Sequence, residues 1–270
     1  MLQLSRVSKT FFAGTSNEVR ALRNVDLTIE QGSFVVVLGT NGSGKSTLLN
    51  AVAGTFTPDA GTIHLDGRPI THLPEHRRAR WIGRVFQDPF SGTAPAMTIA
   101  ENLALASRRG QRRGLGWALT GRRRKELRDR VAAMGLNLED RLDNPIGTLS
   151  GGQRQSLTLL MAGLIRPSLL LLDEHTAALD PKSADQVIQL TQEMVRREKL
   201  TTLMVTHSMQ QAACLGDRAI MMDRGRILHD LRGAEKQRLR PDDLLALFEE
   251  VRRSQQLDES TAQMLRQQYL

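Results

Sequence analysis

A glycine-rich segment has the residue types and the spacing of a phosphate-binding loop. It fits the pattern G-x-x-x-x-G-K-[ST] and reads Gly39-Thr40-Asn41-Gly42-Ser43-Gly44-Lys45-Ser46. The glycines allow successive backbone N–H groups to face inward and form an anion-binding nest, which the positive end of a following helix reinforces. Lys45 would place a charge beside the terminal phosphates, and the Ser46 hydroxyl is suited to Mg²⁺. The segment predicts an ATP site made by Gly39, Asn41, Gly42, Ser43, Gly44, Lys45, Ser46 and Thr47.

Two adjacent carboxylates, Asp173 and Glu174, follow the apolar run at residues 169–172. Two carboxylates at the end of a buried strand are costly unless a cation or a substrate proton uses them. Neighbouring side chains of a strand diverge, so Asp173 can address Mg²⁺ while Glu174 faces the water that attacks the terminal phosphorus. The pair predicts nucleotide hydrolysis, with Asp173 as a metal ligand and Glu174 as the base.

A five-residue motif distinguishes between the many classes of protein that contain a phosphate loop, such as kinases, GTPases and helicases. Residues 149–153 read Leu-Ser-Gly-Gly-Gln and precede an apolar helical stretch. A serine hydroxyl and glycine amides at a helix start form a second anion site. With this signature the chain resembles the ABC (ATP-binding cassette) ATPase family. The resemblance implies that two subunits pack head to tail, and that ATP held by one is contacted by the partner's signature, here Ser150, Gly151, Gly152 and Gln153.

The resemblance also assigns roles to residues outside these motifs. Gln87 matches the glutamine that joins the core to a helical insert and senses the metal and the attacking water. Asp180 matches an aspartate that reaches across the dimer, and His207 matches the histidine that contacts the terminal phosphate and helps to orient Glu174. The expected catalytic residues are Glu174, His207, Gln87 and Lys45, and the expected metal ligands are Ser46, Gln87 and Asp173.

Two positions fit the family pattern less closely. Phe11 is similar in position to the aromatic residue that stacks on adenine, although Phe12 competes for this role and core packing would also explain either side chain. His175 stands where proline commonly follows the catalytic glutamate. The change removes no catalytic group.

The elements that must position these residues alternate along the chain. Strand-like segments are expected at residues 2–12, 21–29, 33–38, 62–65, 169–172, 203–206 and 219–222. Residues 94–166 are rich in helix formers and contain no convincing strand, and a further helix is expected at 182–198. Together with the resemblance, this pattern predicts an α/β fold. It would have a P-loop NTPase (RecA-like) core, an N-terminal antiparallel β subdomain and an inserted α-helical subdomain that carries the signature.

The expected domain boundaries follow from the same pattern. An ABC ATPase domain would span residues 1–233, with 1–93 and 167–233 as the core and β subdomain and 94–166 as the helical subdomain. Residues 234–270 would form a short C-terminal helical extension, because Pro241 precedes an apolar stripe made by Leu244, Leu247, Phe248 and Val251.

The composition indicates a globular chain, since 40% of its 270 residues are hydrophobic. No apolar run approaches the roughly 18 residues that a membrane-spanning helix needs. The N-terminus lacks the apolar middle region of a secretory signal. The single cysteine, Cys214, allows no internal disulfide and fits a reducing compartment. We therefore expect a cytoplasmic chain.

The net charge of +8 is concentrated in a basic run between Arg108 and Arg130. Such a run could be a solvated face, could touch an anionic leaflet or the flank of a permease, or could bind nucleic acid. Trp117 is nearly the only aromatic side chain interleaved with the run, so nucleic-acid binding has little support and none is expected.

The resemblance implies an ATP-hydrolysing subunit that drives a separate membrane permease. Residues 174–182 are similar to a branch of bacterial ATPases, some implicated in uptake of aromatic amino acids, which implies import of a small solute. The expected partners are an integral permease, a second copy of the chain and an extracytoplasmic solute-binding protein. The chain would lie peripherally at the cytoplasmic face of the inner membrane. The alternatives are an exporter ATPase, a soluble ABC protein acting on nucleic acid, and an assembly protein that binds nucleotide without turnover.

Overall fold

A six-stranded sheet forms the centre of the molecule. The computed structural model describes residues 1–111 and 119–250. The strand order is β10-β9-β3-β8-β7-β6, in which β10 alone runs antiparallel to its neighbour. The bounds are β3 (Phe34–Gly39), β6 (Ile82–Val85), β7 (Leu169–Asp173), β8 (Thr202–Val205), β9 (Arg218–Asp223) and β10 (Arg226–Arg232). Every residue of β3 and β8 is buried, as expected for parallel strands covered on both faces.

A smaller antiparallel sheet packs over one face of the central sheet. Its order is β2-β1-β4-β5, with β1 (Leu2–Phe11), β2 (Val19–Ile29), β4 (Ala60–Leu65) and β5 (Arg68–Pro69). Helix α1 (Lys45–Ala53) shares one hydrophobic cluster with both sheets, to which β3 contributes Val35 and Val37. Because side chains alternate along a strand, Val36 and Leu38 point the other way and join a second cluster.

Helices cover the opposite face of the central sheet. The second cluster takes residues from α6 (Pro181–Glu198), from α7 (Met209–Cys214) and from the helical residues 241–250, including Leu244 and Phe248. A short helix, α8 (Gly233–Arg238), joins β10 to this last segment. The described part of the C-terminal segment therefore packs against the sheet, and Val251 of the expected apolar stripe lies outside the described residues.

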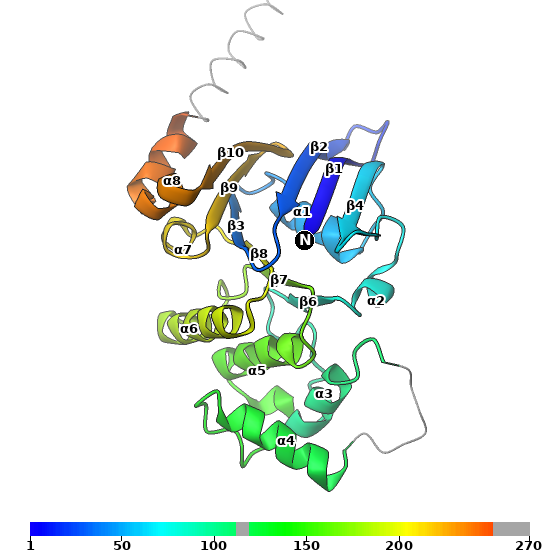
Figure 1. Cartoon of the computed structure of the whole chain (residues 1–270), viewed down its shortest axis with the longest axis vertical. Helices are drawn as coiled ribbons and strands as arrows, with labels where there is room; N and C mark the ends of the chain where they lie inside the picture. Colours follow the sequence, from blue (N-terminus) through cyan, green and yellow to red (C-terminus); the bar gives the residue numbers. More distant parts are fainter. Residues whose placement is uncertain (112–118, 251–270) are drawn as a thin grey trace, which may run out of the picture.

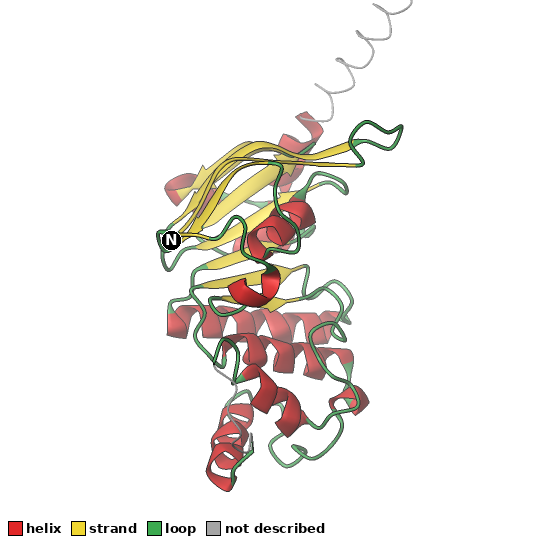
Figure 2. Cartoon of the chain, turned by 90° about the vertical axis from the view of Figure 1, so that its right-hand side faces the viewer, coloured by secondary structure: helices red, strands yellow, loops and turns green. Residues whose placement is uncertain are grey.

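A helical part with its own core extends away from the sheets (Figure 1). It contains α3 (Ile99–Ala106), α4 (Gly121–Ala132), the 3-10 turn η1 (Ile146–Thr148) and α5 (Gly151–Gly163). Figure 2 shows the antiparallel sheet at one end of the molecule and this helical part at the other. Strands β6 and β7, at one edge of the six-stranded sheet, lie between them, next to α2 (Glu75–Arg78) and α5.

The strand and helix assignments made from the sequence are largely found, and the differences have simple causes. Strand β6 is missing from the prediction because it has only four residues, and Gly83 and Arg84 interrupt its apolar pattern. The edge strands β5 and β10 are also missing, since they are mostly exposed and carry no apolar run. No helix in residues 1–111 and 119–250 is both long and apolar enough to cross a membrane.

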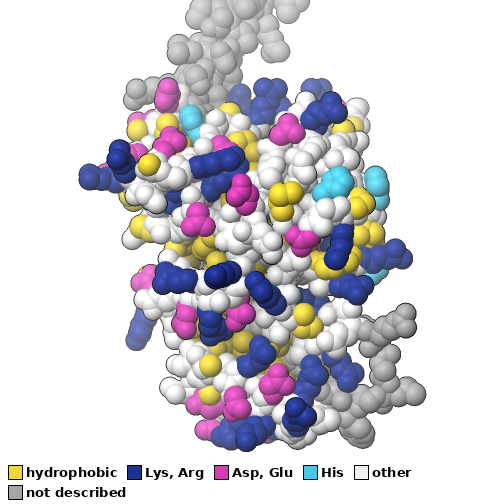
Figure 3. Space-filling model, in the orientation of Figure 1, with side chains coloured by type: hydrophobic (Ala, Val, Ile, Leu, Met, Phe, Trp, Pro, Cys, Tyr) yellow, Lys and Arg dark blue, Asp and Glu magenta, His cyan; other side chains and the backbone are white. Residues whose placement is uncertain are grey.

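Most of the described arginines of the basic run have partners within the helical part. Arg124 and Arg128 pair with Asp143 and Asp140, and Arg130 lies 3.7 Å from Glu126. On the face shown in Figure 3, acidic side chains are interspersed among the basic ones in this part of the molecule. These contacts support the interpretation of a solvated face for helix α4. Arg112, Arg113 and Trp117 lie outside the described residues.

Candidate functional site

The phosphate loop connects the end of β3 to the start of α1, as the sequence predicts. Gly42 and Gly44 have φ angles of 80° and 102°, which favour glycine. A Cβ atom on Gly44 would lie 2.5 Å from the carbonyl oxygen of Ala21, and one on Gly39 would lie 2.4 Å from that of Met222. The surrounding backbone therefore requires glycine at both positions.

Lys45 is buried in the first turn of α1. Its Nζ atom donates hydrogen bonds to the carbonyl oxygens of Gly39 (2.8 Å) and Thr40 (3.0 Å). Burial lowers the pKa of Lys45, while the charges of Glu174 and Asp173 act against this shift. The lysine and both carboxylates therefore share one electrostatic environment.

The loop borders a cavity of about 470 Å³ that brings together distant parts of the sequence. Asn41 to Thr47 form one side, and Glu174, the end of β1 and the start of β2 form the rest. Both Phe11 and Phe12 line this cavity, so the choice between them as the adenine-stacking residue stays open. The buried Ser43 hydroxyl has no hydrogen-bond partner among the described residues, and a phosphoryl oxygen is a suitable acceptor.

Asp173 and Glu174 lie at the carboxyl end of β7, where ligands of open parallel sheets bind. Burial raises the pKa of Asp173, and Arg84, whose Nη2 lies 3.3 Å from Oδ2, acts to lower it. Glu174 has a φ of 42°, a strained value for this residue type, and its N–H donates to the carbonyl oxygen of Val205 (3.0 Å). Strain of this kind commonly occurs at functional sites.

His207 follows β8 and contacts the predicted base. Its Nδ1 lies 3.2 Å from Oε2 of Glu174. The imidazole is otherwise exposed, on the side of the sheet edge that carries the two carboxylates. The structure therefore brings together Lys45, Asp173, Glu174 and His207, as expected from their positions in the sequence.

The signature residues begin helix α5. Ser150 is the N-cap residue, and it exchanges hydrogen bonds with Gln153 in a capping box, each 3.3 Å long. Gly152 packs against α6, because a Cβ there would lie 2.6 Å from Cβ of Ser183. Ser150 and Gly151 are exposed, and they do not line the cavity of the phosphate loop in the part of the chain described.

Gln87 and Asp180 are both exposed and lie apart from the lining of that cavity within residues 1–111 and 119–250. Gln87 follows β6 in the segment between the sheet and the helical part. Asp180 is the N-cap residue of α6, and its carboxylate accepts a hydrogen bond from the N–H of Ser183 (3.1 Å). Hydrogen bonding to the side chain and then to the N–H of Ser183 lowers the pKa of Asp180. Their expected roles toward metal and partner remain predictions.

Two residues of α5 were not singled out from the sequence. One fixes the segment just before the signature, and the other fixes the chain next to Gln87. Arg154 donates to the carbonyl oxygens of Ile146, Gly147 and Leu149, and stacks on Phe90 with its Cζ 3.7 Å from the ring centroid. Gln155 Nε2 donates to the carbonyl oxygen of Phe86 (2.8 Å). A charged and an amide side chain inside a largely apolar helix are the signals that point to such roles.

His175 is fully buried between the acidic strand end and α6. Its Nε2 lies 3.1 Å from Oγ1 of Thr191, and burial lowers its pKa to about 4. The imidazole is therefore neutral at physiological pH. It packs in the position where the family pattern has proline.

A search for similar proteins identifies the family of this chain. The family model described as ABC transporter matches residues 22–177, which include the phosphate loop, the signature and both carboxylates. The chain belongs to the ABC transporter family. The cassette is 44% identical over 249 residues to the tyrosine transport ATP-binding protein of Clostridioides difficile, covering 92% of this chain and 99% of that protein. It is 37% identical to the lipoprotein-releasing system ATP-binding protein LolD 1 of Caulobacter vibrioides, covering 86% and 96%.

Solved structures give the same assignment. The dimeric structure of a post-hydrolysis state of the ATP-binding cassette MJ0796, bound to ADP and Pi, matches with a TM-score of 0.73 at 30% identity. The match covers 86% of this chain and 98% of that one. The ABC ATPase fold and the ATP-hydrolysing class expected from the sequence are confirmed.

Proposed function

We propose that this cassette energises the import of a small solute of the amino-acid class, by hydrolysing Mg²⁺-ATP in a head-to-tail dimer attached to a membrane permease. The contact between Glu174 and His207 beside the phosphate loop supports the hydrolytic part most directly. The likeness to a tyrosine transport protein along nearly its whole length supports the amino-acid class.

The residues of the site fit Mg²⁺ by the chemistry of their oxygen donors. Asp173 offers a carboxylate and Ser46 a hydroxyl, and proteins usually bind Mg²⁺ through one or two carboxylates together with substrate phosphates. Gln87 is the third expected ligand. When bound, the metal would neutralise charge on the terminal phosphates.

The chain's own residues would do the remaining work of hydrolysis. Lys45 and the N–H groups of the loop hold the phosphates. Glu174 accepts a hydrogen bond from the attacking water and orients it toward the terminal phosphorus, while His207 fixes the Glu174 carboxylate and contacts the terminal phosphate. Catalysis of phosphoryl transfer consists mainly of such positioning and charge stabilisation.

The second anion site needs a second copy. Ser150 and Gly151 are exposed at the start of α5 and lie outside the cavity of their own phosphate loop in the described chain. A head-to-tail dimer would bring the signature of one copy, with its Asp180, to the ATP of the other. The dimeric structure of the related cassette MJ0796, bound to ADP and Pi, supports the pairing of two copies.

The permease would dock near the junction between the sheet and the helical part. A cavity of about 540 Å³ lies there, lined by Glu75, Arg84, Phe86 and Leu105 among others. Leu105 and the nearby Phe90 are exposed, which suits an apolar partner surface. This docking would place the cassette peripherally at the cytoplasmic face of the inner membrane, with a solute-binding protein on the other side.

Transport in proteoliposomes tests the proposal. The cassette would be reconstituted with its cognate permease, with ATP on the cassette side and the solute-binding protein on the other. Labelled tyrosine would be placed on one side or the other in separate preparations. We expect ATP-dependent movement of the amino acid toward the cassette side. Movement away from that side would favour the exporter alternative, which the likeness to a lipoprotein-releasing ATPase keeps open.

A further inference from the structure

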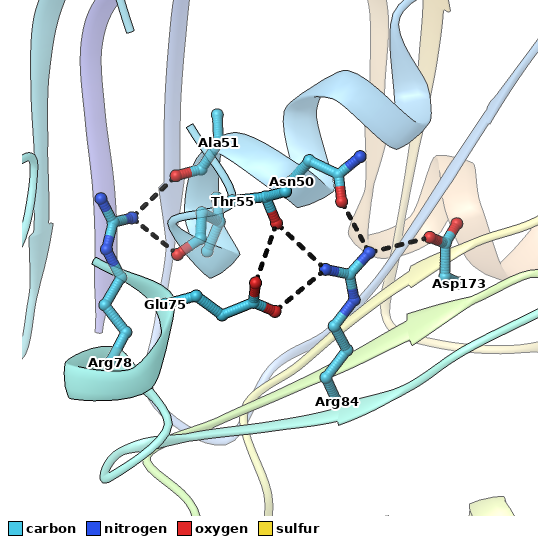
Figure 4. A network of polar contacts seen from close by, with 8 residues as sticks. Asn50, Ala51, Thr55, Glu75, Arg78, Arg84 and Asp173 are labelled. Atoms are coloured by element: carbon cyan, nitrogen blue, oxygen red, sulfur yellow. Dashed lines mark hydrogen bonds and ion pairs between the residues drawn. The ribbon is translucent and has the colours of Figure 1, made fainter. Parts of the chain in front are cut away.

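Arg84 places a cation next to the acidic end of β7. It lies on β6, whose register pairs Arg84 with Leu171 of β7. Its Nη2 atom lies 3.3 Å from Oδ2 of Asp173 and 2.6 Å from Oδ1 of Asn50, and its Nη1 lies 3.5 Å from Oε1 of Glu75 (Figure 4). One guanidinium therefore forms ion pairs with the carboxylates of both Asp173 and Glu75.

The two ion pairs of Arg84 are loose. Charge-assisted hydrogen bonds between nitrogen and carboxylate oxygen are usually about 2.7–2.9 Å long, so both contacts of Arg84 with carboxylates exceed this range. Its Nε is buried without a hydrogen-bond partner among the described residues. The guanidinium is thus not locked onto either carboxylate.

Arg84 has enough other contacts to stay in place without Asp173. Besides Asn50, its Nη1 donates to Oγ1 of Thr55 (3.3 Å), and its Cζ lies 4.5 Å from the ring centroid of Phe86. An arginine stacked on an aromatic ring keeps that interaction whatever its ion pairs are. Arg84 can therefore give up the Asp173 oxygen while the rest of its environment is preserved.

The second carboxylate belongs to a helix that is tied to α1. Glu75 begins the short helix α2, which Arg78 ties to α1 by donating to the carbonyl oxygens of Ala51 (2.7 Å) and Val52 (2.9 Å). Glu75 is half exposed and lines the cavity between the sheet and the helical part, together with Arg84. An acceptor for Arg84 is thus available on the side away from Asp173.

We propose that Arg84 is a positioning residue that competes with Mg²⁺ for the Asp173 carboxylate, and that Glu75 receives the guanidinium when the metal takes Asp173. The proposal rests on the metal role of Asp173 in the proposed function. Two cations cannot share one partly buried carboxylate without repulsion. Arg84 therefore raises the Mg²⁺ concentration that the site needs, and it links metal binding to α2 at the cavity where we place the permease.

A Mg²⁺ titration of nucleotide binding tests this competition. The full chain carries Glu174→Gln to prevent turnover, and a fluorescent ATP analogue at fixed concentration reports binding. Complexation of Mg²⁺ by ATP in solution is the same for every variant, so a difference in midpoint reports the protein. We expect Arg84→Met to lower the midpoint about fivefold, because a competing charge is removed. Arg84→Lys, which restores the charge, should reverse most of this shift.

Two further variants complete the test: one should shift the Mg²⁺ midpoint in the opposite direction, and the other is the control. Glu75→Gln removes the alternative acceptor, so it should raise the Mg²⁺ midpoint about twofold or more. Arg80→Met removes the same charge from an exposed position that stacks on Trp81, and it should leave the midpoint unchanged. Thermal unfolding of each variant checks the fold, and Glu75→Gln decides the question if Arg84→Met is unstable.

The outcomes separate the two proposals. Asp173→Asn removes the carboxylate ligand, so it should raise the Mg²⁺ midpoint about tenfold or more, and if it does not, the metal role of Asp173 fails. If Asp173→Asn raises the midpoint while neither Arg84→Met nor Glu75→Gln moves it beyond the change seen in Arg80→Met, the competition by Arg84 is wrong and the proposed function stands.

Discussion

Among single residues, Glu174 combines the most unusual features. Its backbone is held in a left-handed conformation by the hydrogen bond to Val205, and its carboxylate faces both His207 and the phosphate loop. Asp173, one residue earlier, is buried to a similar extent and pairs with Arg84 instead. The positive φ at Glu174 separates the two carboxylates, so that one can serve a metal and the other a water.

Replacement of this base should separate binding from hydrolysis. Glu174→Gln keeps the shape of the side chain and removes its capacity to hold a proton from water. We expect ATP binding to persist and hydrolysis to fall about 100-fold or more, with a dimer trapped by ATP. Phosphate release and light scattering measure the two effects. Hydrolysis at the wild-type rate would show that another group activates the water.

Lys45 should contribute to binding itself. Lys45→Ala removes a charged donor to the phosphates, so nucleotide affinity should fall by about 10- to 100-fold. Equilibrium titration with a fluorescent ATP analogue measures this loss. Lys125→Ala, on the exposed face of α4, provides the control for a lost lysine charge. Equal affinities of the two variants would contradict the assignment.

At the scale of elements, two helices begin with the same device but only one start is proposed to bind ATP. Ser150 with Gln153 caps α5, and Thr98 with Glu101 caps α3. Ser150→Ala and Thr98→Ala should each reduce the free energy of unfolding by about 1 kcal/mol. Only Ser150→Ala should also weaken ATP-dependent dimerisation in the Glu174→Gln background, as measured by analytical ultracentrifugation. Equal dimerisation of both variants would contradict the proposal that the signature lies at the dimer interface.

The buried His175 packs between the end of β7 and α6, and it should make the free energy of unfolding depend on pH. Burial lowers the pKa of His175 to about 4, so the unfolded chain binds a proton at higher pH than the folded one. This neutral histidine contributes stability above the unfolded pKa of about 6.5, and the contribution is lost as the pH falls toward 4. Between pH 7 and 5 the loss should be about 2 kcal/mol.

Urea unfolding at both pH values measures this effect. His175→Asn has no titrating imidazole, so its stability should depend less on pH over this interval by the same amount. The same pH dependence in the variant and the wild type would exclude His175 as the titrating group.

The sequence specified the elements that carry strong local patterns. The apolar run of β3, the glycines of the loop and the carboxylates after β7 each require one local structure, so their positions follow directly. Arg84 could not be assigned in this way, because its partners Asn50 and Asp173 are distant in the sequence and β6 has only four residues. The choice between Phe11 and Phe12 depends on a ligand, and the sequence does not contain that information.

At the scale of the whole molecule, the two anion sites belong to different parts of the chain. The phosphate loop lies between the sheets, and the signature begins α5 in the helical part (Figure 1). Neither Ser150 nor Gly151 lines the loop's cavity in the chain as described. In the proposed dimer, each ATP site consists of the phosphate loop of one copy and the signature of the other. A single copy therefore contains no complete site, and two copies in a symmetric head-to-tail pair form two.

Mixing two inactive variants tests this claim most directly. Lys45→Ala disables the loop, whereas Ser150→Asp keeps a good helix cap but repels phosphate at the signature. Each variant alone has no intact composite site. In a head-to-tail pair of one copy of each, the intact loop faces the intact signature, so an equal mixture should recover about a quarter of the wild-type ATPase rate. A mixture no more active than its components would contradict ATP binding between two copies.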